Sequence, residues 1–179
     1  MANYSLSDTQ QQLIKDAASF ADKELSGARK TYQHLSTQRE RFQAVRPFFQ
    51  KIVEAGYLKA FIPAPEGGSC ESFLGMSLVL EEFYTAETSV NIALIGTALG
   101  LMPLILGGTK EQKDQFLKPF LTGKGDALAS LAHSEPSGTA NWLEKGGRGL
   151  GVTAKKEGDY YIVNGEKVSM DSSPSAASN

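Results

Sequence analysis

Apolar residues in the first third of the chain recur at helical spacing. A capping-box pattern at Ser7 and Gln10 predicts the start of the first helix. The apolar positions that follow lie three and four residues apart and form one stripe, made of Leu13, Ile14, Ala17, Ala21 and Leu25. Residues 26–38 are polar and predict the end of this helix and a loop.

A second stripe predicts another helix that ends at Gly56, and it comprises Phe42, Val45, Phe49, Ile52 and Val53. Pro47 lies inside that stripe and predicts a kink or the first turn of a new helix.

The same spacing continues after a loop predicted at residues 62–69, which contain two prolines and two glycines. A third stripe predicts another helix and consists of Phe73, Met76, Leu80 and Phe83. Ser89–Leu104 is apolar on most sides, which predicts a buried helix, and its polar, glycine and proline interruptions argue against a membrane span. Thr109 and Gln112 form a second capping box before a short helix that ends near Leu117. Successive helices with short loops predict a helical bundle.

The pattern changes to that of strands after Gly123–Gly125. Three segments have the length and the apolar or β-branched content of strands, namely Ala127–His133, Val152–Lys156 and Tyr160–Val163. Gly158-Asp159 and Asn164-Gly165 predict tight turns next to them. Helices followed by strands predict an α+β chain. We expect a helical domain over residues 1–124, a partial sheet over 125–171 and a disordered tail over 172–179, with three or four strands in an incomplete sheet.

Composition and charge exclude several classes of function. The chain has 179 residues and a formal net charge of −2, with acids and bases mixed, which does not suit a nucleic-acid-binding face. One cysteine, Cys70, and two histidines cannot build an intrachain disulfide or a closed zinc site, so no metal is expected. Residues 1–6 lack the pattern of a secretory signal, and we therefore expect a cytoplasmic protein with no membrane partner.

The segment from Ser130 to Trp142 concentrates polar groups that could bind a ligand. It is dense in hydroxyl, amide and backbone donors, and Pro136 and Gly138 restrict its course. Such a loop could present several N–H groups to a planar polar heterocycle. Composition alone favours a different interpretation, an ordinary loop rich in turn-forming residues.

This segment resembles the flavin loop Thr-Glu-Pro-x-x-Gly-Ser-Asp of the acyl-CoA dehydrogenase superfamily. In the form His-Ser-Glu-Pro-x-Gly-Thr-Ala-Asn-Trp it resembles the nitroalkane oxidase branch of that superfamily. Other stretches agree in the same register: Arg41–Ala44, Arg46–Phe48, Thr97–Pro103, Phe116–Phe120, Asn141–Leu143 and Lys145–Gly147. The resemblance extends from about Leu6 to Lys167, and this breadth makes it stronger than any single motif.

The resemblance implies a helical domain, a middle antiparallel β-barrel and a final four-helix domain, with FAD between the last two. The strands after residue 125 would then be the first strands of an incomplete barrel. The implied cofactor contacts are Leu131, Ala132, His133 and Ser134, followed by Thr139, Ala140 and Asn141. Their role would be to hold the flavin ring and to make it a better electron acceptor. His133 is expected to contact the flavin without transferring a proton.

In the resembled reaction a carboxylate removes the proton beside a nitro group. The products are an aldehyde or ketone, nitrite and hydrogen peroxide. That carboxylate lies in the final domain, so we expect no catalytic residue here and little activity from a truncated chain. Glu81, Glu82 and Glu135 are interpreted as helix-surface charges or loop anchors. Val168–Asp171 does not reproduce the aromatic and hydroxyl flavin contacts of the family, and no site is placed there.

Other functions stay open at this stage. The chain could derive from an enzyme that acts on acyl-CoA substrates, or it could be a non-catalytic helical interaction module. An incomplete gene model would also explain its length. For the full-length family the resemblance implies a small-molecule substrate and a homo-oligomer.

Overall fold

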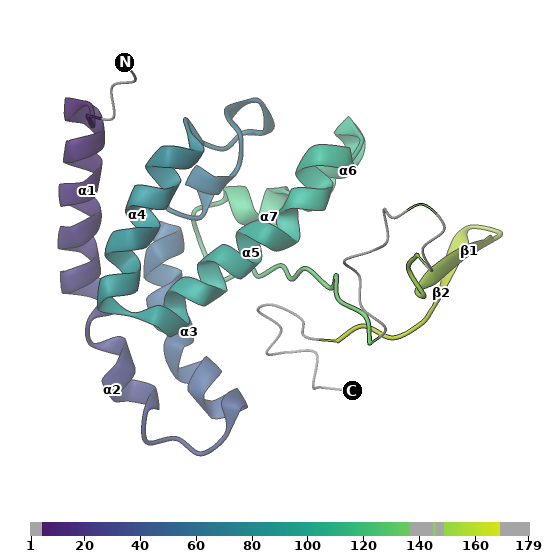
Figure 1. Cartoon of the computed structure of the whole chain (residues 1–179), viewed down its shortest axis with the longest axis horizontal. Coiled ribbons are helices and arrows are strands. Elements are labelled where there is room, and N and C mark those ends of the chain that lie inside the picture. The colour runs from purple at the N-terminus through teal and green to yellow at the C-terminus, as the bar shows by residue number, and fades with distance from the viewer. Residues whose placement is uncertain (1–4, 137–144, 146–148, 169–179) are drawn as a thin grey trace.

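The computed structural model describes residues 5–136, 145 and 149–168. A helical body comes first, and a β-hairpin lies apart from it, joined by irregular chain (Figure 1). Helices followed by antiparallel strands confirm the predicted α+β class. The predicted domain boundaries stay predictions, and the tail over 172–179 falls outside the described residues.

The helical body begins with α1 (Asp8–Phe20), which continues as the π-helical turn η1 (Ala21–Leu25). The other helical elements are α2 (Ala28–Tyr32), α3 (Gln38–Glu54), the 3-10 turns η2 (Lys59–Phe61) and η3 (Ala64–Glu66), α4 (Phe73–Ala86), α5 (Thr88–Gly107), α6 (Lys110–Phe116) and α7 (Lys118–Leu121). The two short turns lie within or beside the region predicted as a loop.

Local sequence signals set several helix ends. Both predicted capping boxes, Ser7 with Gln10 and Thr109 with Gln112, are formed. At the end of α3, Gly56 has a φ of 86°, and the N–H groups of Gly56 and Tyr57 donate to Val53 and Ile52. This is the left-handed stop predicted at Gly56.

Two helical details differ from the sequence prediction. The polar region predicted as a loop contains the short helix α2, whose Ala28 is fully buried. Packing can stabilise a helix of this length when isolated propensity cannot. Pro47 lies inside α3 and does not start a new helix. Because Pro47 and Gln43 are both exposed, water can reach the Gln43 carbonyl that loses its helical donor.

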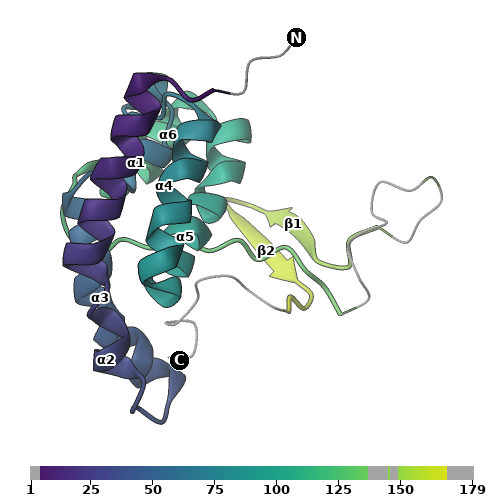
Figure 2. The same cartoon turned by 60° about the vertical axis from the view of Figure 1, so that its left-hand side comes forward.

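The main core lies among the helices of the amino-terminal body. Phe20, Tyr57 and Phe83 form an aromatic cluster in it, with ring centroids 4.7–5.5 Å apart. A second, smaller core of buried residues joins α5 to the chain around it and consists of Ile62, Leu101, Ile105 and Leu117. The two cores fix both ends of α5, which runs through the body in Figures 1 and 2.

Helix α5 is the one helix of the described chain that is long and apolar enough to cross a membrane. Half of the most apolar stretch of this helix is buried inside the fold. Core helices of soluble folds have the same length and composition, and its contacts with α3 and α4 are those of the buried bundle helix that the sequence predicts.

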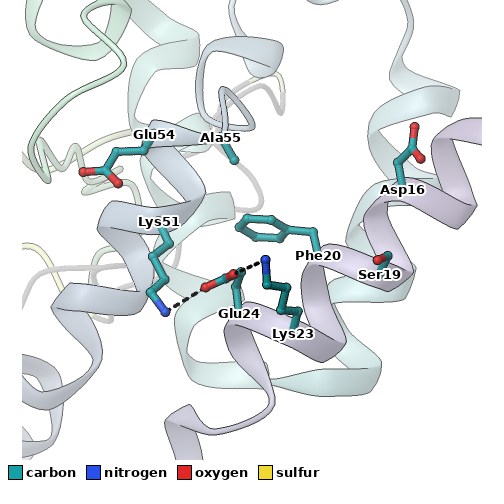
Figure 3. Close-up of a pocket in the computed structure, with 8 residues that line it drawn as sticks. All are labelled: Asp16, Ser19, Phe20, Lys23, Glu24, Lys51, Glu54 and Ala55. Atoms are coloured by element: carbon teal, nitrogen blue, oxygen red, sulfur yellow. Dashed lines mark ion pairs between the residues drawn. The ribbon is translucent and has the colours of Figure 1, made fainter.

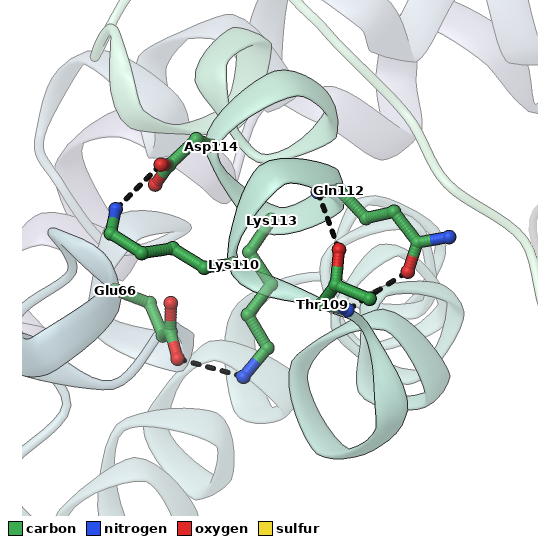
Figure 4. A network of polar contacts seen from close by, with 6 residues as sticks. All are labelled: Glu66, Thr109, Lys110, Gln112, Lys113 and Asp114. Atoms are coloured by element: carbon green, nitrogen blue, oxygen red, sulfur yellow. Dashed lines mark hydrogen bonds and ion pairs between the residues drawn. The ribbon is translucent and has the colours of Figure 1, made fainter.

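Helix α6 is joined to the distant turn η3 by an ion pair. Lys113 Nζ lies 2.8 Å from Glu66 Oε1, and both side chains are largely buried. Figure 4 shows this contact beside the capping box of Thr109 and the exposed Lys110–Asp114 pair. An ion pair therefore links α6 to η3 in addition to the apolar contacts of the smaller core.

The sheet in the described chain has two antiparallel strands, β1 (Thr153–Glu157) and β2 (Tyr160–Asn164). Glu157 pairs with Tyr160 across the predicted Gly158-Asp159 turn, where Gly158 has a φ of 62°. The prediction of a strand at Ala127–His133 is wrong for this structure, because no described strand pairs with it. The described residues contain two strands, and part of the region in which we predicted three or four lies outside them.

Candidate functional site

The segment that leads to the predicted flavin contacts is anchored to the helical body at Asp126. Arg46 of α3 directs both Nε and Nη2 toward Oδ2 of this aspartate. Leu128 packs against the main core, and Ala129 packs against the smaller one. Three successive anchors therefore hold the chain where it leaves the helices.

Gly100 of α5 permits a close approach of backbone to backbone at the same place. A β-carbon at residue 100 would lie 2.5 Å from the backbone nitrogen of Ser130 and 2.7 Å from the carbonyl carbon of Ala129. Only glycine fits this contact without a shift of the chain. Helix α5 thus sets the starting position of the residues that follow.

Leu131, Ala132, His133 and Ser134, which we call the candidate loop, directly follow this contact. Leu131 and Ser134 are half-buried, whereas Ala132 and His133 are exposed. Their backbone is irregular. The other predicted flavin contacts, Thr139, Ala140 and Asn141, lie outside the described residues.

Glu135 fixes the end of the candidate loop. Its side chain is 2% exposed, and its carboxylate accepts hydrogen bonds from Gly151 N (2.5 Å) and Val152 N (3.1 Å) at the approach to β1. Lys167 Nζ lies 2.9 Å from Glu135 Oε1. The carboxylate therefore joins three separate stretches of chain, and we call Glu135 together with residues 151–152 and 165–168 the Glu135 hub.

The hub keeps the Glu135 carboxylate ionised. The Lys167 ammonium and the two backbone N–H groups stabilise the charged form and lower the pKa of Glu135 to about 2. A carboxylate held in this way is a poor proton acceptor near neutral pH. This arrangement agrees with the interpretation of Glu135 as a loop anchor.

Two carbonyl groups of the candidate loop face the hub. The His133 oxygen accepts a hydrogen bond from Lys167 Nζ at 2.9 Å, and the Ser134 oxygen accepts one from Val168 N at 2.9 Å. Each of these oxygens accepts one bond within the protein and has a second acceptor site. Hydroxyl and main-chain N–H groups of the loop could donate to the carbonyl oxygens and ring nitrogens of a flavin, and the small, exposed Ala132 would let a flat ring approach the backbone.

Gly165 brings the end of the hairpin into the hub. It has a φ of 141°, and a β-carbon there would lie 2.6 Å from Val152 Cγ2. Because Thr153 faces Asn164 in the hairpin, Gly165 lies beside Val152 at the next position of the antiparallel pair. Lys167 and Val168 follow directly and reach the candidate loop.

A hollow of about 590 Å³ on the helical body is a different place where a ligand could be sought (Figure 3). Glu24 lies 2.8 Å from Lys51 Nζ and 3.4 Å from Lys23 Nζ, so both lysines of the lining are paired with it. The hydrogen bond from Lys51 lowers the pKa of Glu24. Asp16 and Glu54 also line this hollow.

A second hollow of about 560 Å³ lies between α1 and α4. Burial, with a smaller effect of Asp16, raises the pKa of Tyr57 at its edge and keeps this phenol neutral. Neither hollow is lined by the candidate loop. Glu81 is exposed and Glu82 half-buried on α4, as expected for charges on a helix surface.

Sequence reasoning missed two features of the site. Lys167 belongs to the resembling stretch, but nothing in its local sequence identifies Glu135 as its partner. Gly100 lies within an apolar helix, where glycine is unfavourable unless packing requires it, and this is the one signal that could have indicated the close contact.

Comparisons with known proteins cover the helices, the candidate loop and the hairpin. The family model "Acyl-CoA dehydrogenase, N-terminal domain" matches residues 7–124. Nitroalkane oxidase from Fusarium oxysporum is 45% identical over 168 residues, which are 94% of this chain and 38% of that protein. A nitroalkane oxidase variant crystallised with 1-nitrohexane superposes with a TM-score of 0.86 at 45% identity, covering 93% of this chain and 39% of the other.

A more distant solved structure carries the cofactor. Acyl-CoA dehydrogenase complexed with FAD from Bacillus anthracis superposes with a TM-score of 0.71 at 27% identity, covering 93% of this chain and 27% of the other. These relatives are FAD flavoproteins. The chain spans about two fifths of the length of the nitroalkane oxidase it matches.

Proposed function

The chain belongs to the acyl-CoA dehydrogenase family, and from that membership we propose that it is the flavin-binding amino-terminal part of an oxidoreductase of the nitroalkane oxidase type. The observation that carries the proposal is the placement of the candidate loop. It starts at the Gly100 contact with α5 and ends at Glu135, and its His133 and Ser134 carbonyls are tied to the hub.

Each residue of the candidate loop has a distinct part in this proposal. Leu131 offers an apolar contact, Ala132 leaves room for a flat ring, and Ser134 offers a hydroxyl group. His133 contacts the cofactor and has no role in proton transfer. FAD, when bound, supplies the electron-accepting ring. Thr139, Ala140 and Asn141 complete the proposed contacts from outside the described residues.

We propose nitroalkanes as the substrate class of the whole enzyme, converted to an aldehyde or ketone with nitrite and hydrogen peroxide. Support comes from the 45% identity to nitroalkane oxidase, against 27% for the acyl-CoA dehydrogenase with FAD. An acyl-CoA substrate is the alternative within the family. We further propose that the whole enzyme is a cytoplasmic homo-oligomer.

Residues 1–179 by themselves are proposed to be inactive or nearly so. Glu135 is engaged in the hub, and Glu81 and Glu82 lie on α4, so none of these acids is placed as a base. Loss of a general base typically slows an enzyme by about a hundredfold to ten thousandfold. The test is peroxide production from nitroethane, FAD and oxygen by the purified chain, and rapid turnover would contradict the proposal.

Binding of FAD tests the central part of the proposal directly. Titration of the purified chain with FAD, followed by quenching of flavin fluorescence, should give saturable binding. A Leu131→Asp variant places a charge against the proposed ring and should weaken that binding, while Leu106→Asp, at an exposed residue of α5 outside the candidate loop, should not. Equal affinities for the two variants would contradict the assignment of the loop.

A second candidate function, a non-catalytic interaction module, is favoured by the uncovered apolar surface of the hairpin. Tyr160, Tyr161, Ile162 and Val163 are exposed along β2. A run of exposed apolar residues on an open strand invites pairing with another chain. Mass in solution and flavin absorbance separate the two functions, because a colourless, concentration-dependent oligomer supports the module and a yellow protein supports the flavoenzyme.

A further inference from the structure

We propose that Lys167 is a positioning residue that fixes the conformation of the candidate loop, through hydrogen bonds from its ammonium group to the His133 carbonyl and the buried Glu135 carboxylate. The inference rests on the proposed function, because the loop it positions is the proposed flavin contact. Lys167 itself is not among the predicted cofactor contacts.

The ammonium group of Lys167 lies in a protected place. The side chains of Lys167 and Glu135 are 22% and 2% exposed, whereas those of the hairpin pair Lys155 and Glu157 are 80% and 54% exposed. Solvent and salt weaken ion pairs less when they are buried. Solvent therefore weakens the Lys167–Glu135 contact less than the Lys155–Glu157 pair, which suits a residue that orients a neighbour.

The two partners of Lys167 have different roles. Glu135 keeps its hydrogen bonds from Gly151 and Val152 when the ammonium group is removed, so the approach to β1 stays attached. The Ser134 carbonyl also keeps its bond from Val168, which comes from the main chain. The His133 carbonyl loses the bond from Lys167. Removal of the charge should therefore disturb the loop and spare the rest of the hub.

Gly165 explains how a residue beyond the hairpin reaches the loop. Its close contact with Val152 continues the pairing of Thr153 with Asn164 and keeps the chain after β2 beside the approach to β1, two residues before Lys167. The orientation of the loop is consequently coupled to the hairpin, although the two are far apart in sequence. A lysine on a segment that did not contact β1 would not fix the orientation of the loop in this way.

The test compares three variants of the whole chain. Lys167→Met removes the charge and keeps a similar length, Lys167→Arg keeps the charge, and Lys155→Met removes an exposed charge from the same hairpin. Backbone order at residues 131–135 and, as a reference, in α3 is measured in the FAD-free chain by NMR ¹⁵N relaxation. Affinity for FAD and the visible spectrum of the bound flavin are measured separately.

Lys167→Met should lower the backbone order parameters at residues 131–135 to the flexible range, below about 0.6, with α3 unchanged. It should also weaken FAD binding and broaden the flavin spectrum, while Lys167→Arg largely restores both and Lys155→Met has no effect. Unchanged order parameters in Lys167→Met would overturn the inference, and so would lower order parameters with undiminished FAD affinity. If the unmodified chain binds no FAD, the proposed function fails, while the relaxation result still decides whether Lys167 holds the loop.

Discussion

Gly100 and Ser130 lie so close that a β-carbon at residue 100 would approach the Ser130 backbone nitrogen to 2.5 Å. The central helix and the start of the candidate loop are thus in direct backbone contact. The loop follows the position of α5, and α5 is fixed by both apolar cores. The site is therefore as rigid at its beginning as the helical body that supports it.

Gly100→Ala should displace the segment at Ala129 and Ser130, because the backbone there cannot give way as a flexible side chain can. Crowding of this kind costs roughly 1–3 kcal/mol of folding free energy, and we expect weaker FAD binding in addition. Thermal unfolding and flavin titration check both effects. Gly107→Ala is the matched control on α5, since nothing lies within 4 Å of its β-carbon. Equal effects of the two substitutions would contradict the close contact.

Gly165→Ala should weaken the hydrogen bonds from Gly151 and Val152 to Glu135. The residue has a φ of 141° and its β-carbon would lie 2.6 Å from Val152 Cγ2, so both strain and collision oppose an alanine. Gly158→Ala shares a positive φ but meets nothing within 4 Å. Amide exchange at Gly151 and Val152 should rise far more in Gly165→Ala than in Gly158→Ala. Similar exchange in both variants would mean that the contact between Gly165 and Val152 does not support the hub.

Acid should weaken the hub only well below neutral pH. The pKa of Glu135 is lowered from 4.5 to about 2 in the folded chain, first by Lys167 and then by Gly151 and Val152. The carboxylate therefore contributes stability above pH 4.5, and this contribution declines as the pH falls from there through about 2. The Glu135 carboxyl carbon should titrate near pH 2 by NMR, with Glu135→Gln identifying its signal. A midpoint near 4.5 would show that the ion pair does not form.

Two lysines of α6 allow a comparison of ion pairs in one helix (Figure 4). Lys113 and Glu66 are 17% and 23% exposed, while Lys110 and Asp114 are 81% and 61% exposed. Double-mutant cycles should give a coupling of about 1 kcal/mol for the partly buried pair and almost none for the exposed one. Each kcal/mol corresponds to a change of about 2–4 °C in melting temperature for a chain of this size. A larger coupling for Lys110 with Asp114 would contradict this ranking.

The sequence alone determined the features that depend on a few neighbouring residues. The capping boxes at Ser7 and Thr109 and the stop at Gly56 were predictable because each is a local hydrogen-bonding or backbone choice. The Gly158-Asp159 turn was predictable for the same reason. The family resemblance located the candidate loop, but it did so by comparison, and the loop's composition alone favoured an ordinary turn-rich segment.

Only the tertiary structure decided the features that need a partner distant in sequence. Residues 127–133 have strand composition, yet a strand forms only where another strand pairs with it, and no described strand does. Helix α2 forms in a polar stretch because Ala28 is buried by packing. Glu135 could be interpreted as an anchor from sequence, but its partners at residues 151, 152 and 167 are brought together by the pairing of β1 with β2. Such contacts depend on long-range geometry, which the local pattern of residues does not contain.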